Sequence, residues 1–339
     1  MTTEDKTKGT AARVTILDVA KAAGVSKSSV SRFLDERLPK SDSDTARNVR
    51  RIAAELGYVR DMSAASLRRG KTGMIGVIVP RLTDTVMAML YEALQKAAAR
   101  KSLFAIVATT DDTPDAMRNA AETLLKRGVD GLVLSTARLD DRFTTDLTER
   151  DVPYVLALRT DGHSKSSIGD DELGGYLATR HLLDLGHRRI GLIGGPSYAS
   201  SAAGRLAGYH KAMTEAGIPT ADRLTIEAAF SMESGAVAAR QLIDMAPDLT
   251  AIFAVNDNTA IGALSELQTI GKRVPEDISV VGYNDIPLTA LLPTPLTTVH
   301  VPFEQIATEA IELLLDDESA GTAKYAMPTL IPRASTRRI

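Results

Sequence analysis

Residues 15–34 read TILDVAKAAGVSKSSVSRFL, and this stretch predicts the fold of the first part of the chain. Thr15 followed by Asp18 has the spacing of a capping box, so a helix should begin at Thr15 and end at Gly24. Ser26 can then cap a second helix, in which three apolar residues at helical spacing form one buried face: Val30, Phe33 and Leu34. The remaining serines lie mostly off this face, so the exposed side of the second helix is small and polar.

A third helix should follow, beginning at Asp42, ending at Gly57 and burying four apolar residues: Val49, Ile52, Ala53 and Leu56. Two helices joined by a tight turn and followed by a third have the outline of a helix-turn-helix domain, with expected bounds 13–60. In that geometry the start of the second helix enters the major groove, where short hydroxyls and cations meet bases and phosphates: Lys27, Ser28, Ser29 and Arg32. A small helical bundle with a polar outer face is the alternative.

The charge of the chain is unevenly distributed, although its net value is only -3. Residues 1–71 hold 15 Lys and Arg against 9 Asp and Glu, or +6, which leaves 25 against 34, or -9, for residues 72–339. A basic end can face a polyanion while the acidic remainder stays away from it. Chance variation along the sequence is the alternative explanation.

The same stretch resembles the headpiece signature of the lactose/galactose repressor family of bacterial transcription regulators. The family's AGVS and VSR patterns are matched at residues 23–26 and 30–32, and ELGYVRDMSAASLRRGKTGMIGVIVP at residues 55–80 resembles its third-helix end, hinge and first regulatory strand. The resemblance implies a set of DNA contacts in the headpiece: Thr15, Ser26, Lys27, Ser28, Ser29, Arg32 and Tyr58.

The hinge is expected at residues 61–72, which are too few and too polar to hold a helix alone in water. In the family such a segment orders when two copies pair on DNA, and a leucine wedges into the minor groove. The matching residue is Leu67, with Ala64 one turn earlier, so both are expected to contact DNA. Arg60 and Asp61 depart from the family's proline and asparagine. Without the resemblance, this segment is simply a charged interdomain linker.

The rest of the chain alternates short apolar runs with helical patterns. Seven runs have the character of buried strands: MIGVIV, LFAIVAT, GLVLS, YVLAL, IGLIGG, AIFAV and ISVVGY. Helical patterns occupy residues 86–100, 114–127, 172–185, 202–216 and 258–270. This alternation predicts an α/β domain of parallel sheets, and its length favours two lobes.

The resemblance implies that this domain has the two-lobed periplasmic-binding-protein fold, with chain crossings near residues 165, 295 and 325. The full set of expected parts is a disordered N-terminus (1–12), the headpiece (13–60), the hinge (61–72), an N-terminal lobe (73–165 with 295–325) and a C-terminal lobe (166–294 with 326–339).

Open parallel sheets bind ligands beyond the carboxyl ends of their strands. Applied here, this rule selects residues 80–84, 110–112, 196–201, Ser135, Arg159, Asp170, Asp171, Phe230, Asn256, Asp257, Asn284 and Asp285. Carboxylates, amides and guanidinium groups can pair adjacent hydroxyls, and an aromatic ring can pack on a sugar's C–H face, so the set suits a polyhydroxylated ligand.

Motifs resembling the family's narrow this set. Three segments match effector-contacting segments of the family: RLAGYHKAM, AIFAVNDNTAIGAL and VPEDISVVGYNDIP. The expected effector-binding residues are Arg159, Asp170, Arg205, Phe230, Asn256, Asp257 and Asn284. Leu158 stands where many members carry an acidic residue, so the ligand should be less sugar-like or differently oriented. Asp171 and Asp257 have an alternative role as helix caps.

Other functional classes fit the sequence less well. The chain has no cysteine and its five histidines lack metal-site spacing, so we expect no metal. GLIGG is not the dinucleotide fingerprint GxGxxG and no nucleophile has an adjacent base, so we expect no cofactor and no enzyme activity. A solute-binding protein of the same fold is disfavoured, because no signal peptide is evident and because the sequence contains a helix-turn-helix pattern. We also expect no membrane span and a cytoplasmic location.

The sequence therefore predicts a transcriptional regulator, more often a repressor, whose partners are palindromic double-stranded operator DNA and a small-molecule effector, a sugar or sugar derivative. The resemblance covers roughly residues 14–336 and includes PRAST at residues 332–336. No heptad tail follows this motif, so a homodimer is expected rather than a tail-assembled tetramer. Whether the effector releases DNA or promotes its binding stays open.

Overall fold

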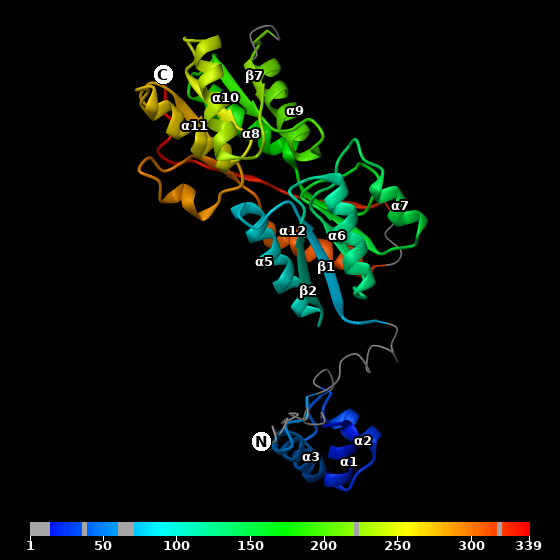
Figure 1. The fold of residues 1–339 in the computed structure, drawn as a ribbon. Helices are drawn as coiled ribbons and strands as arrows, with labels where there is room; N and C mark the ends of the chain where they lie inside the picture. The colour runs from blue at the N-terminus through cyan, green and yellow to red at the C-terminus, as the bar shows by residue number, and fades with distance from the viewer. Residues whose placement is uncertain (1–13, 36–38, 60–70, 220–223, 317–320) are drawn as a thin grey trace, which may run out of the picture. The chain divides into compact units, whose positions relative to one another are not determined.

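The computed structural model describes residues 14–35, 39–59, 71–219, 224–316 and 321–339. The chain divides into two compact units, Met1–Thr72 and Gly73–Ile339, and each is described by itself (Figure 1). The described residues of the first unit form helices and no strands, and the second is an α/β unit with parallel sheets.

The headpiece contains three helices, α1 (Ile16–Ala23), α2 (Lys27–Phe33) and α3 (Asp44–Glu55). The predicted capping box at Thr15 is present, and Gly24 ends α1 with a left-handed φ of 65°. Ser26 caps α2 as expected, because its hydroxyl accepts from the Ser29 N–H. The third helix is capped by Ser43 rather than starting at Asp42.

The headpiece core is formed by one apolar face of each helix. Val19, Val30 and Val49 are fully buried in it. Leu56 was predicted to join them but is 39% exposed, because it is the C-cap residue beyond the last turn of α3. Tyr58, two positions later, packs against this core.

The first lobe of the α/β unit contains a six-stranded parallel sheet in the order β11-β5-β4-β3-β1-β2. Its strands are β1 (Met74–Val79), β2 (Phe104–Thr109), β3 (Leu132–Leu134), β4 (Tyr154–Ala157), β5 (Ser166–Gly169) and β11 (Ala323–Ala326). Val77 and Val79 pack with α5 (Thr85–Arg100) and α12 (Phe303–Leu315). Ile78 packs on the opposite face, with α6 (Pro114–Lys126) and α7 (Phe143–Glu149).

The second lobe contains a four-stranded parallel sheet in the order β7-β6-β8-β9. Its strands are β7 (Leu224–Glu227), β6 (Ile190–Gly194), β8 (Ala251–Ala254) and β9 (Ser279–Val281). Two helix pairs pack together here, α8 (Asp171–Asp184) with α9 (Ser200–Glu215) and α10 (Met232–Met245) with α11 (Asp257–Thr269), and a short 3-10 helix, η2 (Pro287–Ala290), follows β9.

The lobes are joined by shared core and by strands. One hydrophobic cluster continues from Leu90 and Val133 in the first lobe to Leu182 and Tyr209 in the second. The strands β10 (Thr298–His300) and β12 (Thr329–Ile331) form an antiparallel pair of their own.

Two of the crossings between the lobes lie a few residues later in the chain than expected. The chain leaves the first lobe after β5, which ends at Gly169 and not at residue 165, because β5 pairs with β4 and β11. It returns after His300 rather than near 295, because Thr297 and His300 still bridge to the end of the second sheet. The last crossing follows β11, which ends at Ala326.

Candidate functional site

The exposed face of α2 carries the residues predicted to read DNA. Lys27, Ser28 and Arg32 are exposed and Ser29 is half-buried. The hydroxyl of Ser26 lies 2.8 Å from that of Ser28 and 2.9 Å from that of Ser29, so the start of the helix is a compact hydroxyl cluster. The cationic residues Lys27 and Arg32 belong to the same helix. The short side chains at the start of α2 allow this helix to approach base edges closely.

The other predicted DNA contacts are placed differently. Thr15 is exposed, but its hydroxyl donates to Asp18 at 2.7 Å as part of the capping box. Tyr58 is half-buried against the headpiece core. Ala64 and Leu67 lie outside the described residues.

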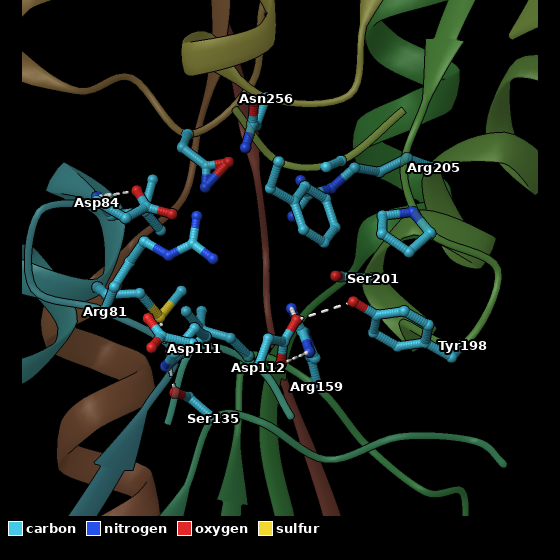
Figure 2. Close-up of a pocket in the computed structure, with 18 residues that line it drawn as sticks. Arg81, Asp84, Asp111, Asp112, Ser135, Arg159, Tyr198, Ser201, Arg205 and Asn256 are labelled. Atoms are coloured by element: carbon cyan, nitrogen blue, oxygen red, sulfur yellow. Dashed lines mark hydrogen bonds and ion pairs between the residues drawn. The ribbon is translucent and has the colours of Figure 1, made fainter. Parts of the chain in front are cut away.

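A pocket lies between the two lobes, at the carboxyl ends of the strands of both sheets (Figure 2). Five of the seven predicted effector residues line it: Arg159, Arg205, Phe230, Asn256 and Asn284. The other lining residues are Pro80, Arg81, Asp84, Val86, Met87, Asp111, Asp112, Ser135, Leu158, Pro196, Tyr198, Ser201 and Ala229. Val86, Met87 and Ala229 were not predicted, since apolar residues here have no pattern that separates a pocket wall from a core.

Two predicted effector residues do not line the pocket. Asp170 is the N-cap of α8, and its Oδ1 accepts from the Leu173 N–H at 2.9 Å. Asp257 is fully buried, where its Oδ1 accepts from the Thr298 hydroxyl at 2.6 Å and its Oδ2 from the Ile286 N–H at 2.9 Å. Burial raises the pKa of Asp257 to about 7. Both carboxylates therefore organise backbone and neighbouring strands. Asn256, not Asp257, is the cap of α11.

Arg205 is the centre of a buried polar cluster at the second-lobe side of the pocket. Its Nε donates to Asp171 at 2.8 Å, its Nη1 donates to the Val255 carbonyl at 2.8 Å, and its guanidinium lies 3.7 Å from the centroid of the Tyr283 ring. Burial raises the pKa of Asp171, and the neighbouring Arg205 opposes that shift. The charge of Arg205 is thus compensated inside the protein.

Arg159 is compensated in the same way at the first-lobe side. It donates two parallel hydrogen bonds to Asp112, at 3.0 and 3.1 Å, and is 5% exposed. The hydroxyl of Tyr198 donates to the same carboxylate at 3.0 Å, and burial, followed by the charge of Asp112, raises the pKa of Tyr198.

Other polar groups of the pocket keep capacity for a ligand. The Oδ1 of Asn284 is buried and has no hydrogen-bond partner among the residues that the structure describes. Asn284 also has a positive φ of 109°, a sparsely populated conformation that fixes its side chain at the pocket. Asp84 accepts from the Val86 N–H and from Asn258, and burial raises its pKa.

Neither a metal site nor a membrane-spanning helix is found among the residues that the structure describes. No group of three or more His, Asp or Glu residues there is arranged to hold a metal ion. No helix among residues 14–35, 39–59, 71–219, 224–316 and 321–339 has both the length and the hydropathy needed to cross a bilayer.

Comparison with known proteins assigns both units. Residues 15–61 match the model of the bacterial regulatory proteins of the lacI family, and residues 179–336 match a periplasmic binding protein-like domain. The HTH-type transcriptional repressor PurR of Vibrio atlanticus (strain LGP32) is 32% identical over 332 residues, which are 96% of this chain and 99% of that one.

Two solved structures are similar over nearly the whole chain. A complex of the transcriptional regulator CelR with cellobiose has a TM-score of 0.73 and 30% identity, covering 95% of this chain and 100% of that one. A Lac repressor dimer bound to operator and the anti-inducer ONPF has a TM-score of 0.83 and 28% identity, covering 96% and 99%. These relatives are transcription regulators and not enzymes. With a lacI-type helix-turn-helix headpiece and a two-lobed periplasmic-binding-protein-like domain, the chain belongs to the LacI family of bacterial transcription regulators.

Proposed function

We propose that this regulator binds a palindromic operator as a homodimer, and that an uncharged, hydroxyl-rich molecule, a sugar or sugar derivative, binds in the pocket between the lobes and changes its affinity for DNA. The observation that carries the effector half is the buried, unpaired Oδ1 of Asn284 at the pocket wall. An unsatisfied buried acceptor costs roughly 1–3 kcal/mol, and a hydroxyl donor removes that cost.

The charges of the pocket favour an uncharged ligand. Three arginines and three aspartates line it, namely Arg81, Arg159, Arg205, Asp84, Asp111 and Asp112. The two buried arginines already pair with carboxylates of the protein, and Arg81 lies near Asp84. A phosphate or carboxylate on the ligand would meet no uncompensated buried cation, so its desolvation would not be offset.

The remaining wall combines polar and apolar groups in the manner of a carbohydrate site. Phe230 supplies an aromatic face, while Ser135, Ser201 and Asn256 supply hydroxyl and amide groups. The cellobiose complex of a related regulator supports this choice, since its title names a carbohydrate ligand. Leu158 adds an apolar contact, which suits a sugar derivative that lacks a hydroxyl at that point.

The DNA half of the proposal is supported by the surface of α2 and by the operator-bound dimer of the related Lac repressor. Two copies would place two such helices on the two half-sites of a palindrome. Arg32 can donate two hydrogen bonds to a guanine, and Lys27 can reach a base or a phosphate.

Binding measurements on DNA that the protein selects from a random library test both halves. Affinity should fall steeply with salt, and one uncharged sugar from a panel of neutral and phosphorylated sugars should change it. The variant Asn284→Ala should weaken that effect without changing the affinity for DNA alone. If only charged or non-carbohydrate compounds change the affinity for DNA, the proposed effector class is wrong. If the protein selects no DNA sequence from the library, the proposal that it binds a specific operator is wrong.

A further inference from the structure

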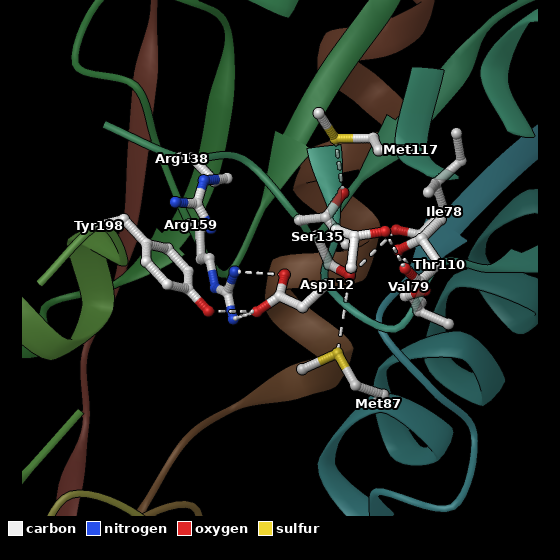
Figure 3. Close-up of polar contacts among 12 residues, drawn as sticks. Ile78, Val79, Met87, Thr110, Asp112, Met117, Ser135, Arg138, Arg159 and Tyr198 are labelled. Carbon is white, nitrogen blue, oxygen red and sulfur yellow. Dashed lines mark hydrogen bonds and ion pairs between the residues drawn. The ribbon is translucent and has the colours of Figure 1, made fainter. Parts of the chain in front are cut away.

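Tyr198 of the second lobe contacts three residues of the first lobe, Asp112, Arg138 and Leu139, and Figure 3 shows the first two beside it. It lies in the segment between β6 and α9, and its hydroxyl donates to Asp112 at 3.0 Å. Its carbonyl accepts from the Leu139 N–H at 2.9 Å, and the guanidinium carbon of Arg138 lies 3.5 Å from the centroid of its ring. We call Tyr198, Asp112, Arg138, Leu139 and Arg159 the Tyr198 clasp.

The first-lobe groups of the clasp are held in place before they meet Tyr198. Arg159 fixes the Asp112 carboxylate by its two parallel hydrogen bonds. Arg138 is fixed by two hydrogen bonds of 2.8 Å to Asp140. A rigid acceptor and a rigid cation therefore face Tyr198, so little side-chain entropy is lost when the contacts form.

Further hydrogen bonds join the lobes next to the clasp and across the pocket. Beside it, the Thr160 N–H donates to the Ser200 hydroxyl at 2.8 Å. On the other side of the pocket, Asn258 donates to Asp84 at 3.1 Å, and Figure 2 places Asp84 and Tyr198 at opposite edges. Two of these four hydrogen bonds between the lobes are made by Tyr198, which adds the ring contact with Arg138.

The carboxylate of Asp112 has little capacity left for a ligand. A carboxylate offers about four acceptor sites, and three of them are taken by Arg159 and Tyr198. Asp112 lines the pocket, but two of its hydrogen bonds hold Arg159 within the first lobe and the third joins it to Tyr198 of the second lobe.

We propose that the Tyr198 clasp keeps the lobes closed through protein groups alone, so that an effector enters and leaves the pocket only when the clasp opens. Tyr198 is then a positioning residue that sets the rate of effector exchange. This inference rests on the proposed function for the existence of an effector, but the clasp itself needs none to form.

A clasp between the lobes affects the kinetics of effector binding differently from a direct contact with the effector. Because the clasp is made of protein groups only, it can form in the closed protein with and without effector, and weakening it should raise the open fraction in both cases. Association and dissociation rate constants should rise by the same factor, and their ratio should stay nearly constant. Loss of a hydrogen bond to a carboxylate in this half-buried setting corresponds to about a tenfold change.

The variant Tyr198→Phe tests this, because it removes the hydroxyl and keeps the ring. The matched control is Tyr176→Phe, whose hydroxyl donates to Glu215 at 2.8 Å entirely within the second lobe. The chain has no cysteine, so Lys126→Cys and Asp244→Cys, both exposed, place one fluorophore on each lobe of the full-length protein. Arg138→Gln weakens the clasp from the other lobe and serves as a second variant.

Energy transfer between the fluorophores reports lobe opening without any effector. Tyr198→Phe and Arg138→Gln should lower the closed fraction, and Tyr176→Phe should not; an unchanged distance distribution in both clasp variants overturns the proposal. With a sugar found in the DNA-binding panel, Tyr198→Phe should raise both rate constants about tenfold. A rise in dissociation alone would make Tyr198 a direct effector contact. If no sugar acts, the proposed function fails, while the opening measurement still decides the clasp.

Discussion

Replacing Asp257 by asparagine should remove a pH dependence from the stability of the α/β unit. The Asp257 side chain is fully buried, and its pKa is raised from 3.8 to about 7, by burial first and then by the nearby Asp285. The folded chain therefore holds a proton on Asp257 that the unfolded chain releases above about pH 4. The stability that this proton contributes is complete below pH 3.8, declines as pH rises, and is lost above pH 7.

The magnitude follows from the two pKa values. The span from 3.8 to about 7, at roughly 1.4 kcal/mol per pH unit, amounts to about 4 kcal/mol. Asparagine stays neutral at every pH and can keep both contacts. Its carbonyl can accept from the Ile286 N–H and its amide can donate to the Thr298 hydroxyl.

Urea denaturation of both proteins between pH 4 and pH 8 measures the difference directly, and subtraction cancels every other titrating group. The two should be nearly equal at pH 4, and Asp257→Asn should be more stable by about 4 kcal/mol at pH 8. Asp277→Asn is a control of opposite sign, since hydrogen bonds from Arg273 hold the pKa of Asp277 below its usual range. A difference between wild type and Asp257→Asn that does not change with pH would refute the reasoning.

Three further changes test other parts of the structure. Arg32→Ala should weaken binding to the selected DNA by about 1–3 kcal/mol, and it should weaken non-specific binding much less. Gel-shift titrations at fixed salt measure both affinities, and equal losses of the two would contradict a base contact by Arg32. Arg205→Met leaves the buried Asp171 unpaired and should lower the free energy of unfolding in urea by roughly 3–5 kcal/mol. Adding Asp171→Asn should restore part of that loss, and no recovery would argue against the ion pair. Gly262→Ala would place a Cβ 1.8 Å from the Met232 carbonyl oxygen. Thermal unfolding should therefore show that the free energy of unfolding falls by about 3 kcal/mol. An unchanged stability would contradict the close packing of α10 on α11.

Local signals predicted much of the fold. The caps at Thr15 and Ser26 are formed within single turns of the chain, so sequence spacing alone reveals them. The seven apolar runs each contain a strand. Most of these strands are buried on both faces and are therefore continuously apolar, and the edge strand β2, with Phe104 exposed, is an exception. The serines of β5 broke that pattern, although Ser166 and Ser167 are fully buried in the sheet.

The candidate site was predictable in its location but not in its contacts. Strand ends indicated the pocket, and the segment containing Tyr198 was among them. The partner of Tyr198, Asp112, is 86 residues away along the chain, and no local pattern connects them. Asp257 was expected at the pocket, but it is not among the lining residues, and its carboxylate accepts a hydrogen bond from Thr298, 41 residues later.

Because the chain crosses between the lobes three times, neither lobe is continuous in the sequence. The first sheet needs β11 and the second lobe needs residues 334–339, where Ser335 bonds to the backbone of Val280 and Ile339 to that of Leu185. No single cut divides the α/β unit into two complete lobes, and on the ribosome neither lobe can be finished until the last few dozen residues have emerged. Among the described residues, the headpiece core comes from Val14 to Tyr58, so the headpiece can fold long before the part that regulates it.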